Sequence, residues 1–274
     1  LAYDEVFREN QKLAKVLQGA DFAYDSRGLS LVPHSVAFRK PWSKSTDNLA
    51  TTFCLYSTDE CRKTCLVNTG QRALEDGAFA LSYMFSQALR SDPEAFVRVL
   101  HAAAVQSFQT VGKHRRFLRF NVLSDIPWEL VVPGFIESVC DEARSAAGIR
   151  RYRKTDGFGV YDYSKVPYRK VDPRYYDLTF SFTGVENRMQ QFFDTISGGG
   201  KSAVVFVKRE MDGGYRPAPG KALSSKSKKD DYYPWAFFDM AVWNGDKSDI
   251  RALDPEDVQI VGLTYKVSRY KVAA

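Results

Sequence analysis

Histidine is scarce in this chain, with three residues among 274. So few imidazoles leave little material for a histidine metal site or for histidine-dependent catalysis. The sequence also lacks the G-x-x-x-x-G-K-S/T phosphate loop, the H-E-x-x-H zinc helix and the G-x-S-x-G nucleophile elbow. Any chemistry therefore has to use cysteine, carboxylates, lysine, arginine or tyrosine.

Long apolar runs are missing as well, and we expect no membrane-spanning helix. Hydrophobic residues make up 44% of the chain and aromatic residues 14%, which is typical of a globular protein with a substantial core. A single α/β barrel reaches this length, so we interpret residues 1–274 as one domain. We expect residues 1–27 to begin with a helix and to lead into this domain. We expect residues 212–231 to form a flexible basic loop.

The formal net charge is +6 at pH 7, a mild excess of basic residues. These residues are densest in the segments 113–116, 150–154 and 226–229. Such segments suit nucleic acid or another anionic partner. Solvated loop charge explains them equally well.

Three of the four cysteines lie close together: Cys54, Cys61 and Cys65 are spaced C-x6-C-x3-C. Clustered thiolates are soft ligands for an iron–sulfur cluster or for zinc. Three ligands with one open position favour a reactive cluster, because a structural zinc normally has four protein ligands. Separately buried cysteines are the plain alternative. Without a recognisable secretion signal, the clustering favours a reducing cytoplasm over a disulfide framework.

Strand and helix patterns alternate along the chain. This order predicts a parallel sheet in an α/β fold, which we interpret as a partial or distorted (β/α) barrel that is TIM-barrel-like. The predicted strands are 29–33, 117–122, 158–162, 177–182, 202–207, 238–242 and 258–265. The predicted helices are 4–17, 72–89, 92–108, 133–147 and 187–196.

Polar residues follow these strands, where ligands collect in parallel α/β folds. Aspartates there would accept hydrogen bonds or protons, and basic side chains would neutralise an anionic group. Helix capping is the structural alternative for such residues. The catalytic candidates are Asp125, Lys165 and Asp246, and the substrate-binding candidates are Asn121, Glu129, Asn187, Asn244 and Arg251.

Several of these segments resemble the gene product 88 domain proteins of mycobacteriophages, other actinobacterial phages and mobile elements. The resemblance extends over about residues 28–266, nearly the whole chain. It is carried by Gly28–Leu31, Cys54–Cys65, Asn68–Gln71, Arg119–Glu129, Tyr161–Pro167, Leu178–Phe182, Ala203–Phe206, Asn244–Arg251, Asp254–Pro255 and Val261–Leu263.

The three-cysteine loop also looks like a variant of the loop in radical S-adenosylmethionine enzymes, although their spacing is C-x3-C-x2-C. That likeness implies a 4Fe–4S cluster on Cys54, Cys61 and Cys65, with S-adenosylmethionine as cosubstrate. We therefore expect a cluster-dependent enzyme with a small-molecule or nucleotide substrate at the barrel rim. The alternatives are a nucleic-acid-binding phage replication or takeover protein with a structural metal such as zinc, and a protein that binds a host protein.

Overall fold

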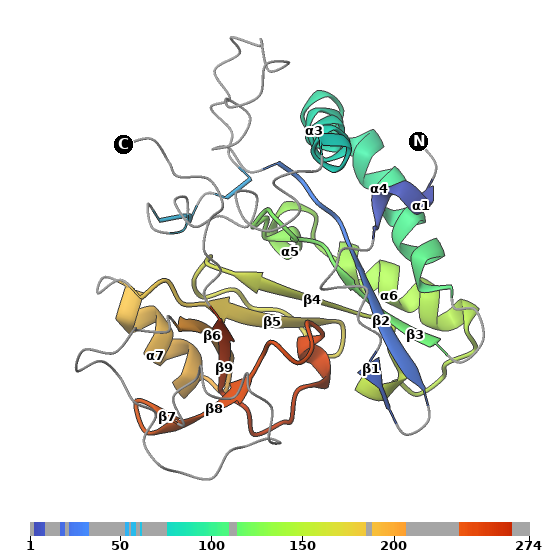
Figure 1. Cartoon of the computed structure of the whole chain (residues 1–274). Coiled ribbons are helices and arrows are strands. Elements are labelled where there is room, and N and C mark those ends of the chain that lie inside the picture. Colours follow the sequence, from blue (N-terminus) through green and yellow to red (C-terminus); the bar gives the residue numbers. More distant parts are fainter. Residues whose placement is uncertain are drawn as a thin grey trace.

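The computed structural model describes residues 3–8, 17–19, 22–32, 53–54, 56–58, 61, 76–109, 114–184, 188–206 and 236–264. Within these residues the chain has a mixed α/β fold (Figure 1). Nine described strands form a mostly parallel sheet in the order β1-β2-β3-β4-β5-β6-β9-β8-β7. The predicted α/β class and parallel sheet are therefore confirmed.

The strands are β1 Leu17–Gln18, β2 Ala23–Gly28, β3 His114–Arg119, β4 Gly159–Ser164, β5 Tyr176–Ser181, β6 Lys201–Phe206, β7 Ala236–Phe237, β8 Met240–Asn244 and β9 Ile260–Thr264. The helices are α1 Tyr3–Val6, α3 Asp76–Ser91, α4 Pro93–Phe108, α5 Trp128–Val131, α6 Phe135–Ala146 and α7 Met189–Ser197. Two short 3-10 helices are η4 Lys154–Asp156 and η7 Arg251–Leu253.

From β2 to β6 the strands are parallel and follow one another in chain order. β9 and β8 continue the parallel sheet, and β1 and β7 pair with it antiparallel at its two ends. Right-handed crossovers between sequential parallel strands place their helices on the same face. No pairing joins β1 to β7 in the part of the chain described, so closure into a barrel stays a prediction.

The main core lies between the sheet and α4 and α6. Leu100 of α4 and Val139 of α6 are fully buried against Leu118 of β3. A second core packs Phe192 of α7 against Phe180 of β5. Alternate residues of a strand share a face, and β5 gives its even-numbered side chains to both cores. These helices therefore cover one face of the sheet, and η7 packs against the other.

The beginning of α4 confirms a sequence prediction in atomic detail. Asp92 is the N-cap, and its carboxylate accepts the Ala95 N–H at 2.9 Å. Pro93 lies in the first turn of α4. An N–H group in this turn has no acceptor within the helix, so proline can stand there without the loss of a hydrogen bond. The helix ends at Phe108, as the apolar pattern indicates.

The predicted first strand was wrong. The strand that pairs with β3 is β2, Ala23–Gly28, and Leu29 only extends that pairing through its main chain. The polar composition of β2 hid it, because its charged side chains have partners inside the protein. Asp25 forms an ion pair with Arg116 at 2.6 Å.

The predicted strand at 238–242 begins later than expected. Phe238 and Asp239 both have positive φ, 48° and 60°, and form the two-residue turn of the β7–β8 hairpin. That geometry is a type I′ turn, which asparagine and glycine usually occupy. The sequence therefore gave no turn signal here. No helix among the described residues is long and apolar enough to cross a membrane.

We predict that Phe120→Ala destabilises the fold by about 3–5 kcal/mol, because it leaves a cavity in the main core. Phe120 is fully buried and its ring contacts those of Phe7, Trp128 and Phe135. Leu130→Ala is the control, since Leu130 is 68% exposed and should change stability by about 0.5 kcal/mol or less. Equal urea midpoints for the two variants would contradict this prediction.

Candidate functional site

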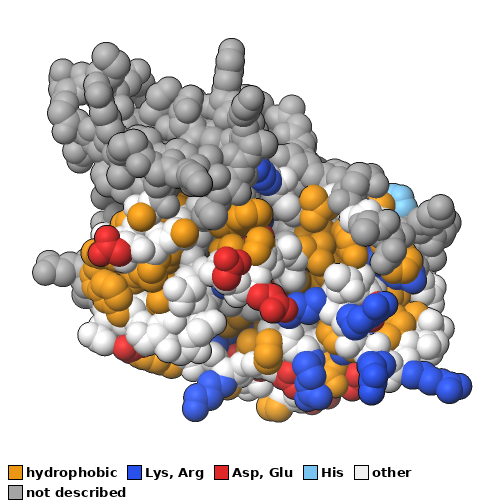
Figure 2. Space-filling model, turned by 90° about the horizontal axis from the view of Figure 1, so that it is seen from below, with side chains coloured by type: hydrophobic (Ala, Val, Ile, Leu, Met, Phe, Trp, Pro, Cys, Tyr) orange, Lys and Arg blue, Asp and Glu red, His pale blue; other side chains and the backbone are white. Residues whose placement is uncertain are grey.

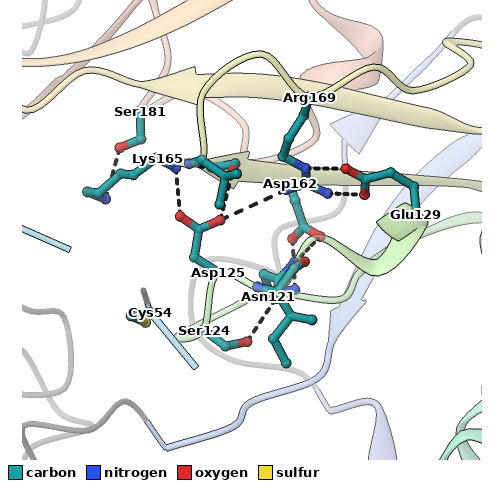
Figure 3. A network of polar contacts seen from close by, with 12 residues as sticks. Cys54, Asn121, Ser124, Asp125, Glu129, Asp162, Lys165, Arg169 and Ser181 are labelled. Carbon is teal, nitrogen blue, oxygen red and sulfur yellow. Dashed lines mark hydrogen bonds and ion pairs between the residues drawn. The ribbon is translucent and has the colours of Figure 1, made fainter. Parts of the chain in front are cut away.

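Asn121 organises the loop that follows β3 (Figure 3). Its main-chain N–H donates to Asp162 Oδ1 at 2.8 Å, and its side-chain amide donates to Asp162 Oδ2 at 3.1 Å. The same amide group donates to the Ile126 carbonyl at 3.0 Å. Its oxygen accepts the Ser124 hydroxyl and the Ile126 N–H, both at 2.9 Å. Asn121 is 1% exposed, so its contribution is to hold the loop in place.

Asp125 connects the ends of β3 and β4. Its carboxylate accepts the Ser164 hydroxyl at 2.6 Å and the Lys165 N–H at 2.7 Å. The Lys165 ammonium donates to the Ser181 hydroxyl at 3.2 Å, which brings in the end of β5. An ammonium group has three donors, so Lys165 keeps capacity for a ligand. The Asp125 N–H donates to the Phe53 carbonyl at 2.7 Å, which fixes the segment before Cys54.

Glu129 is held by Arg169, a residue that the sequence reasoning missed. The guanidinium donates to both carboxylate oxygens, at 2.7 and 2.6 Å, and to the Tyr176 hydroxyl at 3.1 Å. Arg169 Nη1 lies 3.9 Å from Asp125 Oδ1, and the Arg169 side chain is 1% exposed. Arg169 belongs to the basic connection 165–174, away from a strand end. In the sequence, Arg169 was marked only by its positive charge within this basic connection.

Asp162 lies beneath these groups and is fully buried. Burial raises the pKa of its carboxyl group to about 6, although Arg119 and the Asn121 N–H act in the opposite direction. The Tyr176 hydroxyl donates to Asp162 Oδ2 at 2.8 Å. Burial also raises the pKa of Tyr176 well above its usual value, so it remains a neutral donor. The site therefore contains a buried carboxyl group that changes protonation in mildly acidic solution.

Cys54 lies beside this network (Figure 3). Its thiol is half-buried and donates to the Leu123 carbonyl at 3.3 Å. Cys61 is also half-buried, and its N–H donates to the Thr58 hydroxyl at 3.2 Å. Cys65 lies outside the described residues. The structure thus brings the first cysteine to the loop that carries Asp125.

Among the residues that the structure describes, no group of three or more histidine, cysteine, aspartate or glutamate side chains could hold a metal ion. That the three cysteines together bind a metal or cluster therefore stays a prediction. Cys140 is different, because it is fully buried in α6. Burial raises the pKa of its thiol to about 12, as expected for an unreactive core residue.

Arg251 holds a turn of the chain. It is fully buried, its guanidinium donates to the Gly245 carbonyl at 3.2 Å and to the Ser248 carbonyl, and it pairs with Asp254 at 3.3 Å. The expected role of Arg251 in binding a substrate anion stays a prediction. Burial also raises the pKa of Asp254 to about 6, although Arg251 acts in the opposite direction.

The remaining candidates lie near this turn or outside the described residues. Asn244 accepts the Asp246 N–H with its side chain at 3.1 Å, and Asn187 is not described. Arg119 connects the turn with the loop after β3. It donates to Asp249 at 3.0 Å and to the Asn121 carbonyl at 3.3 Å. The structure therefore gathers Cys54, Asn121, Asp125, Glu129 and Lys165, with Asn244, Asp246 and Arg251 in a neighbouring turn.

The basic segments differ in how their charge is used. In 113–116, Arg116 pairs with Asp25 and the Arg115 guanidinium lies 4.1 Å from the centre of the Phe22 ring. In 150–154, Arg150 and Arg151 are exposed. Figure 2 shows Lys and Arg side chains along one side of the face seen from below, with Asp and Glu among them. The segment 226–229 lies outside the described residues, and nucleic-acid binding stays a prediction.

Comparison with known proteins identifies a family. A family model described as Gene product 88 matches residues 6–269, which confirms the resemblance inferred from the sequence. No curated protein and no solved structure matches the chain. The likeness to radical S-adenosylmethionine enzymes therefore stays a prediction.

We predict a pH-dependent difference in stability between the wild type and Asp162→Asn. The raised pKa means that the folded protein retains a proton that the unfolded chain has lost between pH 3.8 and about 6. The stability due to this proton is fully present below pH 3.8 and is lost as the pH rises through about 6. The wild type should thus lose up to about 1.4 kcal/mol per pH unit relative to the variant.

Urea unfolding at intervals across this pH range measures the difference. Asp257→Asn, which changes an exposed carboxylate, is the control. A constant difference between the wild type and Asp162→Asn would show that Asp162 does not retain the proton.

We also predict that Arg169→Met destabilises the fold by about 3–5 kcal/mol, because it leaves Glu129 as a buried carboxylate without its partner. The double variant Glu129→Gln/Arg169→Met removes both charges and should recover part of this loss. Thermal and urea unfolding of the three proteins measure the effect. A double variant less stable than the single one would contradict this account of the pair.

Proposed function

The chain belongs to the gene product 88 family, and we propose that it is an iron–sulfur-cluster-dependent enzyme whose substrate binds at the carboxyl ends of β3, β4 and β5. The observation that carries the proposal is the position of Cys54. Its thiol contacts the Leu123 carbonyl, and the preceding residue accepts the Asp125 N–H. A cysteine and the polar strand ends thus share one site.

The donor chemistry fits such a cluster. Cys54 and Cys61 are half-buried thiols, which suits a group that must be shielded from water and yet reached by a substrate. Cys65 would provide the third ligand. When bound, the cluster would supply electron transfer or an open iron site to the reaction.

The chain's own residues would bind and orient the substrate. Lys165 would neutralise an anionic group, because its ammonium makes one described contact, with Ser181, and its other donors are available. Asp125 holds the Lys165 main chain and would accept a hydrogen bond or proton from the substrate. Asp162 and Glu129, both fixed by neighbours, would position these groups from beneath.

A (β/α) barrel and S-adenosylmethionine remain part of the proposal. The sequential parallel order from β2 to β6 supports the barrel, since (β/α) barrels have that order. Beyond β6 the strands follow as β9 and β8, against chain order. The C-x6-C-x3-C spacing differs from the usual radical S-adenosylmethionine loop. Binding of S-adenosylmethionine to the cluster-loaded protein therefore has to be measured separately.

We predict that anaerobically purified protein is brown and contains iron and acid-labile sulfide in similar amounts. Cys54→Ala, Cys61→Ala and Cys65→Ala should each lose most of both, because each removes one cluster ligand. Cys140→Ala should keep them, since Cys140 is a core residue far from the loop in sequence. Iron and sulfide analysis with visible absorbance spectra measures the outcome.

Circular dichroism of the variants establishes that each is folded before its iron content is compared. A wild type without iron and sulfide after anaerobic reconstitution would overturn the proposal. Bound zinc together with steeply salt-dependent affinity for DNA or RNA would instead favour the nucleic-acid-binding alternative.

A further inference from the structure

A cavity of about 410 Å³ lies apart from the site described above. It is formed where the end of α6 meets the connections that lead into β4 and β5, at the amino ends of these strands. Cys54, Asp125 and Lys165 all belong to the carboxyl ends. The lining residues are Asp141, Arg144, Ser145, Ile149, Arg150, Tyr152, Arg174 and Tyr175.

Arg144 forms the rigid wall of this cavity. Its guanidinium lies 3.5 Å from the centre of the Tyr152 ring and 4.7 Å from that of Tyr175. It donates to the Phe158 carbonyl at 3.0 and 3.2 Å and to the Arg174 carbonyl at 2.6 Å. These contacts fix the two aromatic rings and the main chain at Arg174 before any ligand arrives.

The carboxylate in the cavity already has partners. Asp141 accepts the Tyr175 hydroxyl at 3.3 Å and lies 4.0 Å from Arg144 Nη1. Its negative charge is therefore largely balanced within the wall. The lining contains three arginines and this one carboxylate, and a second carboxylate, Asp172, pairs with Arg174. The remaining excess of positive charge favours an anion.

Arg150 and Arg174 supply the donors that an anion would use. Arg150 is exposed and makes no ion pair with the described carboxylates. Arg174 pairs with Asp172 through Nε and Nη2, at 2.9 and 2.5 Å, which orients its guanidinium and leaves Nη1 as a further donor. Guanidinium groups bind carboxylates and phosphates with two parallel hydrogen bonds.

We propose that this cavity binds a small molecule with a carboxylate or phosphate group, held by Arg150 and Arg174. The volume lies within the range of small-molecule pockets, and Ile149 with the two tyrosine rings provides apolar contacts for the rest of the ligand. The site is independent of the proposed cluster, because none of its lining residues is a cysteine.

The chain offers a matched pair of variants. Arg150→Gln and Arg151→Gln remove the same charge from neighbouring exposed residues, but only Arg150 lines the cavity. Inorganic phosphate, adenosine monophosphate and succinate serve as probes, which distinguishes a tetrahedral anion, a nucleotide and a carboxylate. Isothermal titration calorimetry with the full chain measures their affinities.

We expect saturable binding of at least one probe, weakened about tenfold by Arg150→Gln and less than about twofold by Arg151→Gln. Arg174→Gln should also weaken binding, and Cys54→Ala should leave it unchanged. If Arg150→Gln and Arg151→Gln lowered the affinity for the probe equally, the binding would reflect only general attraction to positive charge, and the proposal would be overturned. Absence of binding by all three probes would overturn it as well, whatever the iron content of the protein.

Discussion

The Asp162 carboxylate is fully buried, and a buried carboxylate needs hydrogen bonds on both oxygens. Asn121 supplies two of them, one from its main chain and one from its side chain, and Tyr176 supplies the third. The loop after β3 therefore has to pass directly over the end of β4. Asp125 occupies its position because this loop does, and there it accepts the N–H of Lys165, the residue after β4.

The same loop also positions the first cysteine. Asp125 uses its carboxylate to hold the end of β4 and its N–H to hold Phe53, so one residue connects the sheet with the cysteine segment. A catalytic constellation needs such support, since side chains placed on loops are otherwise less precise than those on strands. Glu129 and Arg169 contribute in the same way, and their ion pair holds two side chains that are 11% and 1% exposed.

Local signals in the sequence were sufficient to predict features that depend on neighbouring residues, such as the beginning of a helix. Asp92 and Pro93 identified the start of α4 because capping depends on neighbours in sequence. β2 and Arg169 were missed because their polar side chains find partners far along the chain, as Asp25 does with Arg116. Arg251 resembled a ligand-binding residue for a different reason. Its partners are carbonyls of its own turn, which composition does not reveal.

Arginine has different roles at the two ends of the strands. Some arginines hold neighbouring side chains in place, and others keep hydrogen-bond donors that a ligand could use. At the carboxyl ends, Arg169 and Arg119 are buried and paired with carboxylates, so the groups left for a ligand are Lys165 and Asp125. Around the cavity at the amino ends, Arg144 is buried, and Arg150 and Arg174 reach solvent. A buried guanidinium that pairs internally fixes geometry, whereas an exposed one beside it retains the hydrogen bonds that a ligand needs. The cavity at the amino ends has both kinds, which is the arrangement that a preformed anion site requires.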